Sequence, residues 1–120
     1  LEYGAFGLYL TPRDLARFGQ MVLDDGVWQG RRIVSEAWLE QATAMHVERP
    51  DGWHYGYYFW IDAARGYIAA RGHGGQHALV VPELDLVIVI TAESTGSGDM
   101  GLSVSDIDAL IAGVIAAVRE

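Results

Sequence analysis

The 120-residue sequence contains no lysine, no asparagine and no cysteine, and all eight of its cationic side chains belong to arginine. Without cysteine the chain forms no disulfide, uses no thiol nucleophile and offers no cysteine metal ligand. Without lysine or asparagine, a mechanism that needs a lysine base, a lysine Schiff base or an orienting asparagine cannot run on this chain alone.

Positive charge and long apolar runs are also scarce. Eight arginines face sixteen acidic residues, so the formal net charge is −8. An acidic surface repels phosphate backbones, and we expect no nucleic-acid partner.

No uninterrupted apolar run exceeds about five residues (86–90, for example), whereas a membrane span needs roughly 20. We therefore expect no membrane-spanning segment. Residues 1–4 lack the features of a signal peptide, and the sequence leaves localisation open.

Three segments carry helix signals in a chain that is 51% hydrophobic. The Thr-Pro pair at residues 11–12 is typical of a helix start, and Gly26 suits the helix end. Ser35 is expected to open a second helix that runs to about Met45. A third helix is predicted to begin near residues 103–106, with an apolar stripe formed by Val104, Ile107, Ile111, Val114, Ile115 and Val118.

Four segments are predicted to form strands, with residues 1–10 as a further strand or extended lead-in. They are residues 55–61, 67–70, 77–81 and 86–92. Their short connections favour an antiparallel meander, so the predicted fold class is α+β: a sheet of about four strands with two N-terminal helices and a C-terminal helix packed on it. The last two strands are apolar at nearly every position, which predicts cover on both faces. We expect part of that cover to lie outside this chain.

One segment, which we call the glycine corner, has the composition of a segment that lines a catalytic site. It is the run Gly72-His73-Gly74-Gly75-Gln76. Glycines allow sharp bends and close approach to a ligand, and a backbone N–H beside them can donate to an oxyanion. The same run is equally typical of a plain turn between two strands with a surface histidine, and the motif alone leaves both interpretations open.

Two other kinds of chemistry find little support. His73 and His77 flank the glycines instead of sharing a helix face, the HExxH pattern is absent, and His46 and His54 suit loops. We therefore expect no metal and no other cofactor. A Ser/His/Asp triad lacks its usual G-x-S-x-G elbow; residues 95–98 come nearest and are better explained as a polar loop.

An aromatic cluster precedes the glycine corner, consisting of Trp53, Tyr55, Tyr57, Tyr58, Phe59 and Trp60. Strand alternation would place Tyr55, Tyr57 and Phe59 on one side of a single strand. Tyr58 and Trp60 would then face the other side. The cluster predicts either a strand packed on both faces or rings that line a cleft beside the glycine corner.

Several segments, taken in order, resemble the serine β-lactamase-like hydrolases, which include class C β-lactamases, DD-peptidase-like proteins, related esterases and oligomer amide hydrolases. They are residues 7–19, 26–35, 55–57, 72–76 and 81–87. The resemblance extends from residue 3 to about residue 92, and the final predicted helix fits it. It implies the partial fold of a β-lactamase or transpeptidase.

The resemblance also implies roles for individual residues. In such hydrolases a Ser-x-x-Lys pair supplies the nucleophile and base, a Tyr-x-Asn motif carries a proton, and a Lys-Thr-Gly or His-x-Gly motif lies on a strand at the cleft. His73, Gly74 and Gly75 match His-x-Gly. The backbone N–H of Gln76 would be an oxyanion donor, His73 a positioning group, and Gly74, Gly75, Tyr55 and Tyr57 substrate contacts.

The missing lysine and asparagine depart from that pattern, because neither Ser-x-x-Lys nor Tyr-x-Asn can be written in this sequence. We therefore expect residues 1–120 to be the C-terminal portion of a β-lactamase-like domain, inactive alone. Its partners would be the missing N-terminal half and a small-molecule acyl substrate: an ester, amide or β-lactam. Without that half, exposed apolar surface would favour homo-oligomers. The alternative is a non-catalytic interaction or structural module that reuses the fold.

Overall fold

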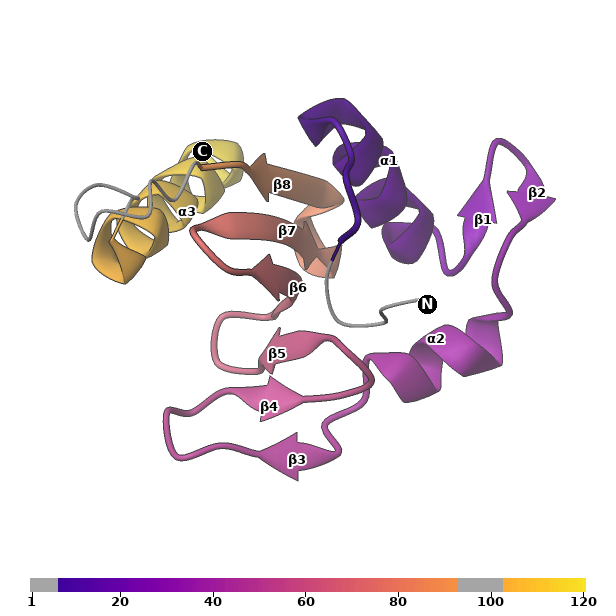
Figure 1. The fold of residues 1–120 in the computed structure, drawn as a ribbon, viewed down its shortest axis with the longest axis horizontal. Helices are drawn as coiled ribbons and strands as arrows, with labels where there is room; N and C mark the ends of the chain where they lie inside the picture. The colour runs from indigo at the N-terminus through magenta and orange to yellow at the C-terminus, as the bar shows by residue number, and fades with distance from the viewer. Residues whose placement is uncertain (1–6, 93–102) are drawn as a thin grey trace.

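The structure, a computed structural model, describes residues 7–92 and 103–120, so the predicted polar loop at residues 95–98 lies outside the described residues. Three helices and two antiparallel sheets follow one another along the chain (Figure 1). The elements are α1 (Pro12–Leu23), β1 (Val27–Trp28), β2 (Arg31–Arg32), α2 (Glu36–Ala42), β3 (Val47–Glu48), β4 (His54–Tyr55), β5 (Trp60–Asp62), β6 (Tyr67–Gly72), β7 (Gln76–Val81), a 3-10 turn (Pro82–Leu84), β8 (Leu86–Ile90) and α3 (Val104–Arg119).

The six strands β3 to β8 form one sheet in which each strand pairs with its neighbours in the sequence. The α+β class and the antiparallel meander are therefore confirmed. The sheet has six strands instead of about four, because the short strands β3 and β4 carry too few residues for an alternating pattern to reveal them. Residues 7–10 form no strand, and residues 1–6 lie outside the described part.

The helix ends follow the predicted caps. The Thr11 hydroxyl accepts a hydrogen bond from the Asp14 N–H at the start of α1, and Ser103 forms a capping box at the start of α3. Helix α2 ends at Ala42, three residues before the predicted Met45. The Thr43 hydroxyl donates to a carbonyl of the last turn, at 2.8 Å, and the chain then turns toward the sheet.

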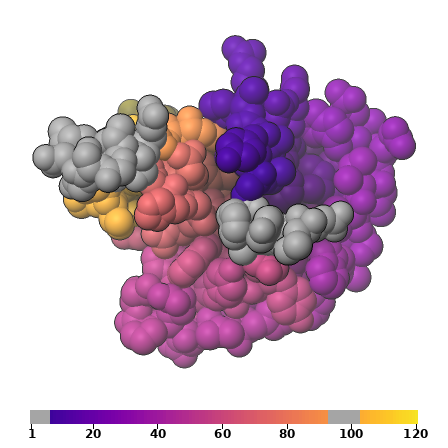
Figure 2. Space-filling view, in the orientation of Figure 1, coloured from indigo at the N-terminus to yellow at the C-terminus, as the bar shows by residue number. Residues whose placement is uncertain are grey.

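Helices cover both faces of the central strands. On one face, Leu79 and Val81 of β7 pack in a cluster with Ile107 and Ile111 of α3. On the other face, Val80 packs with Met21 and Val22 of α1 and with Leu39 of α2. Figure 1 shows α1 and α3 beside β7 and β8, and in the space-filling view α1, in indigo, lies against the orange sheet strands (Figure 2). Strand β7 is therefore covered within the described chain, whereas Leu86, Val87 and Val89 of β8 are only half-buried. The expectation that part of the cover of these two strands lies outside the chain stays a prediction.

The predicted strand over residues 55–61 is also wrong. The chain leaves β4 after Tyr55 and enters β5 at Trp60, and residues 56–59 form a bend, which we call the aromatic turn. The Gly56 N–H donates to the Phe59 carbonyl at 2.8 Å, and Tyr58 has φ of +64°. Alternation along a single strand therefore does not decide which way these rings point.

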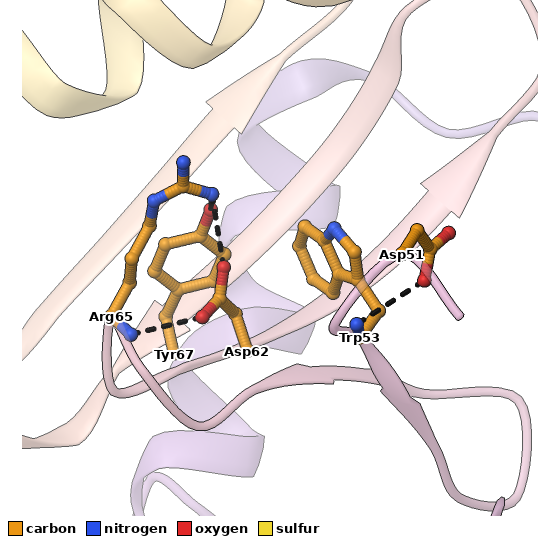
Figure 3. Close-up of polar contacts among 5 residues, drawn as sticks. All are labelled: Asp51, Trp53, Asp62, Arg65 and Tyr67. Atoms are coloured by element: carbon orange, nitrogen blue, oxygen red, sulfur yellow. Dashed lines mark hydrogen bonds and ion pairs between the residues drawn. The ribbon is translucent and has the colours of Figure 1, made fainter. Parts of the chain in front are cut away.

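Two aspartates fix the turns on either side of β4 and β5 (Figure 3). The buried Asp62 accepts from the Arg65 backbone N–H at 2.9 Å and from its guanidinium at 3.0 Å. The exposed Asp51 accepts from the Trp53 backbone N–H at 3.2 Å. Within the described ranges, no helix combines the length and apolarity that crossing a membrane requires.

Candidate active site at one end of the sheet

Strand register places the glycine corner and the aromatic turn at the same end of the sheet. Trp60, the first residue of β5, pairs with Ala69 of β6. Strand β6 continues three residues past Ala69 to Gly72, which pairs with Gln76 at the start of β7. Because β5 and β6 are antiparallel, the aromatic turn before β5 and the glycine corner after β6 lie at the same end of the sheet, with the corner three β6 residues further along.

The glycine corner forms the turn between β6 and β7. Gly74 and Gly75 have φ of +77° and +88°, which glycine adopts at little cost. A Cβ on Gly75 would lie 3.2 Å from the Ala92 Cβ and 3.3 Å from the Ile107 Cδ1 of α3. The backbone at Gly75 is therefore pressed against α3, whereas His73 is exposed and Gln76 is half-buried.

The Gln76 side chain has a structural role that the sequence did not suggest. Its Nε2 donates a hydrogen bond to the Ala92 carbonyl just beyond β8. This bond fastens the start of β7 to the end of the neighbouring strand. The partner is a backbone oxygen sixteen positions along the chain, so no local sequence signal could have revealed it.

Tyr55 and Tyr57, the two predicted substrate contacts, line one hollow despite their different local settings. Tyr55 packs edge to face on Trp60, with ring centroids 5.0 Å apart. Tyr57 stacks on His46 at 4.5 Å and contacts Trp38 of α2 at 5.7 Å. Trp38 lies on α2, and more than half of it is exposed, 55%.

This hollow is open to solvent and measures about 650 Å³, within the roughly 300–1,000 Å³ of small-molecule sites. Its lining consists of Trp38, Ala42, Tyr55, Gly56, Tyr57, Tyr58 and Phe59. The predicted site residues therefore fall into two groups at the same end of the sheet: the glycine corner and this aromatic hollow.

His77 is the buried titratable group next to the glycine corner. It lies on β7, opposite Arg71 of β6, and is 9% exposed. Burial lowers the pKa of the His77 imidazole, and the positive charge of Arg71 lowers it further, whereas Asp108 of α3 acts the other way. The Arg71 guanidinium itself stacks on Trp53 and Trp60, at 4.8 Å and 5.1 Å from the ring centroids.

We expect this burial to make the fold sensitive to acid. Because the pKa of His77 is lower in the folded chain than in the unfolded chain, the unfolded state binds more protons and the free energy of unfolding falls below about pH 6.5. His77→Gln should reduce this loss, measured by denaturant unfolding at about pH 7 and pH 5. His73→Gln, at an exposed position, is the matched control. An identical pH dependence in the wild type and His77→Gln would refute the assignment.

Metal chemistry has no visible site here: across residues 7–92 and 103–120, no three histidine or acidic side chains gather in a way that could hold a metal ion. His73 and His77 are separated by the turn, as exposed and buried residues respectively.

Comparison with known proteins gives consistent matches. The family described as Beta-lactamase matches residues 1–112. A 6-aminohexanoate-dimer hydrolase from Paenarthrobacter ureafaciens is 34% identical over 94 residues, covering 69% of this chain and 24% of that protein. A solved Bacillus anthracis protein, named as a candidate 6-aminohexanoate-dimer hydrolase, has a TM-score of 0.65 at 24% identity, over 88% of this chain and 28% of that one. The chain thus spans about a quarter of the length of either protein.

Proposed function

Because the chain belongs to the beta-lactamase family, we propose that it contributes one wall of the active site of a serine hydrolase that works by acyl transfer. The observation that carries this proposal is that the glycine corner and the aromatic hollow lie at the same end of the sheet. A reacting carbonyl needs hydrogen-bond donors, and the rest of the substrate needs a surface to bind; these two groups would supply both.

In this proposal each residue of the wall has a distinct role. The backbone N–H of Gln76 donates to the oxygen that becomes negative when the acyl carbonyl is attacked. The second donor is the N–H of a nucleophilic serine, whose Ser-x-x-Lys motif lies outside these residues, since the sequence has no lysine. His73 positions the substrate at the exposed tip of the corner, Gly74 and Gly75 keep the approach open, and Tyr55 and Tyr57 contact the substrate.

The substrate class within acyl transfer is chosen by side chains, not by the fold. Esters, amides and β-lactams are all consistent with the proposed chemistry. The curated relative is named for hydrolysis of a 6-aminohexanoate dimer, so a linear amide is the first substrate to test.

The rest of the protein is proposed to contact the exposed apolar residues before α1. Leu8 and Tyr9 are 80% and 95% exposed, and contiguous exposed apolar side chains are typical of contact surfaces. The 120-residue chain alone would then self-associate through this segment.

Turnover assays test the proposed function. The complete protein should hydrolyse at least one member of a panel containing 6-aminohexanoate dimer, a short acyl ester and a chromogenic β-lactam, and replacing the serine of Ser-x-x-Lys should abolish the activity. The 120-residue chain should give no turnover with the same panel. Activity of the short chain that survives repurification would contradict the proposal, and a complete protein inactive on the whole panel would favour the non-catalytic module.

A further inference from the structure

The aromatic turn is held in a fixed shape by its contact with the end of α2. The Tyr57 N–H donates to the Ala42 carbonyl at 2.9 Å, and the Gly56 N–H donates to the Phe59 carbonyl at 2.8 Å. A Cβ on Gly56 would lie 2.2 Å from the Ala42 carbonyl oxygen. Gly56 is buried, so the turn is positioned by backbone contacts on both sides.

Tyr58 occupies a strained conformation within this turn. Its φ of +64° is unusual for a bulky residue, because the Cβ crowds the neighbouring backbone. The strain does not bury the ring, since Tyr58 remains 69% exposed. Strain held by the surrounding structure points to function where it presents a side chain that packing does not require.

The hollow that Tyr58 borders has a defined chemistry. Its lining contains no acidic side chain, no arginine and no histidine, and the tyrosine hydroxyls and the Trp38 indole N–H are its side-chain polar groups. This is unusual in a chain of net charge −8. A surface of aromatic rings without a cationic partner favours hydrocarbon and disfavours a carboxylate group that would lose its hydration.

We propose that this hollow binds the uncharged hydrocarbon arm of the acyl substrate, with Tyr58 and Trp38 as the residues that set this specificity. The inference rests on the proposed function, because the hollow and the glycine corner lie at the same end of the sheet. Its size of about 650 Å³ accommodates an alkyl chain of several carbons. Tyr58 and Trp38 both line the hollow, and the Trp38 indole lies against the Tyr57 ring, with centroids 5.7 Å apart.

Binding to the 120-residue chain tests the proposal without any requirement for turnover. The probes are 1-hexanol and 6-hydroxyhexanoate, which share a six-carbon chain and a hydroxyl group and differ by a terminal carboxylate group. Neither contains a hydrolysable bond. Chemical shifts of the Trp38 indole N–H and the Tyr58 backbone N–H should move with 1-hexanol and at least fivefold less with the carboxylate at equal concentration.

Two glycine substitutions supply the matched comparison. Tyr58→Gly removes the ring and relieves the positive φ, so the fold should be retained while 1-hexanol affinity falls at least fivefold. Gln29→Gly gives the same backbone relief at a positive φ of +49° in the exposed β1–β2 turn and should leave affinity unchanged. Trp38→Ala should weaken binding as Tyr58→Gly does.

The possible outcomes distinguish hydrocarbon binding by the hollow from the proposed hydrolase activity. Unchanged affinity in Tyr58→Gly, equal responses to the two probes, or shifts scattered over the whole surface would overturn the inference and leave the hydrolase proposal standing. Specific 1-hexanol binding with a complete protein that hydrolyses nothing would retain the hydrocarbon site and remove its role in acyl transfer.

Discussion

Replacing Gln76 with proline is expected to lower turnover of the complete protein by about 10²–10³-fold, the usual effect of removing one oxyanion donor. Proline has no backbone N–H, so the substitution deletes the proposed donor at the first residue of β7. The loss should appear mainly in kcat, because the oxygen carries its full negative charge in the transition state and not in the bound substrate.

Gln76→Ala is the matched control. Alanine keeps the backbone N–H but loses the side-chain bond to the Ala92 carbonyl, which should cost about 1 kcal/mol of stability and less than about tenfold in turnover. Unfolding curves of both variants establish how much of each loss is structural. If the alanine and proline variants lost turnover equally, the fastening of β7 by the Gln76 side chain would explain the effect, and the donor assignment would fail.

Replacing Gly56 with alanine is expected to lower the free energy of unfolding by about 3 kcal/mol, among the larger effects of a single substitution. The added Cβ would lie 2.2 Å from the Ala42 carbonyl oxygen and 2.9 Å from that of Ala44. Both are backbone atoms, so relief requires the aromatic turn to move away from α2. Denaturant unfolding measures the stability, and indole fluorescence should report the displacement of Trp38.

Gly113→Ala is the control of opposite sign. Gly113 lies inside α3, and a Cβ there would meet nothing within 4 Å. Alanine in an unobstructed helix interior should stabilise the chain by about 0.5–1 kcal/mol. A Gly56→Ala variant as stable as the wild type would mean that the close contact between the aromatic turn and α2 is absent in solution.

Local sequence patterns predicted much of the fold. The helix starts at residues 11–12 and near residue 103 were predicted and are confirmed, and at both a hydroxyl before the helix accepts from a free N–H. The last two strands were predicted because their apolar residues are continuous. The family resemblance, read from ordered motifs, is confirmed by the match over residues 1–112.

The errors arose where distant backbone contacts outweigh local pattern. The aromatic run at residues 55–60 has strong strand propensity, yet the backbone bonds of Gly56 and Tyr57 bend it around Ala42. The hydrogen bond from Gln76 to Ala92 depends on how the strands are paired. The position of the glycine corner and the aromatic hollow at one end of the sheet depends on the same strand pairing. The donor role of Gln76 and the substrate roles of Tyr55 and Tyr57 remain predictions.

The most direct test replaces single backbone amides by esters in the complete protein, which removes an N–H while keeping every side chain. An ester in place of the Gln76 N–H should lower kcat about 10²-fold or more, while the same change at His73 should lower it less than about tenfold. Full activity with the ester at Gln76, or a loss confined to His73, would contradict the assignment of the oxyanion donor to Gln76.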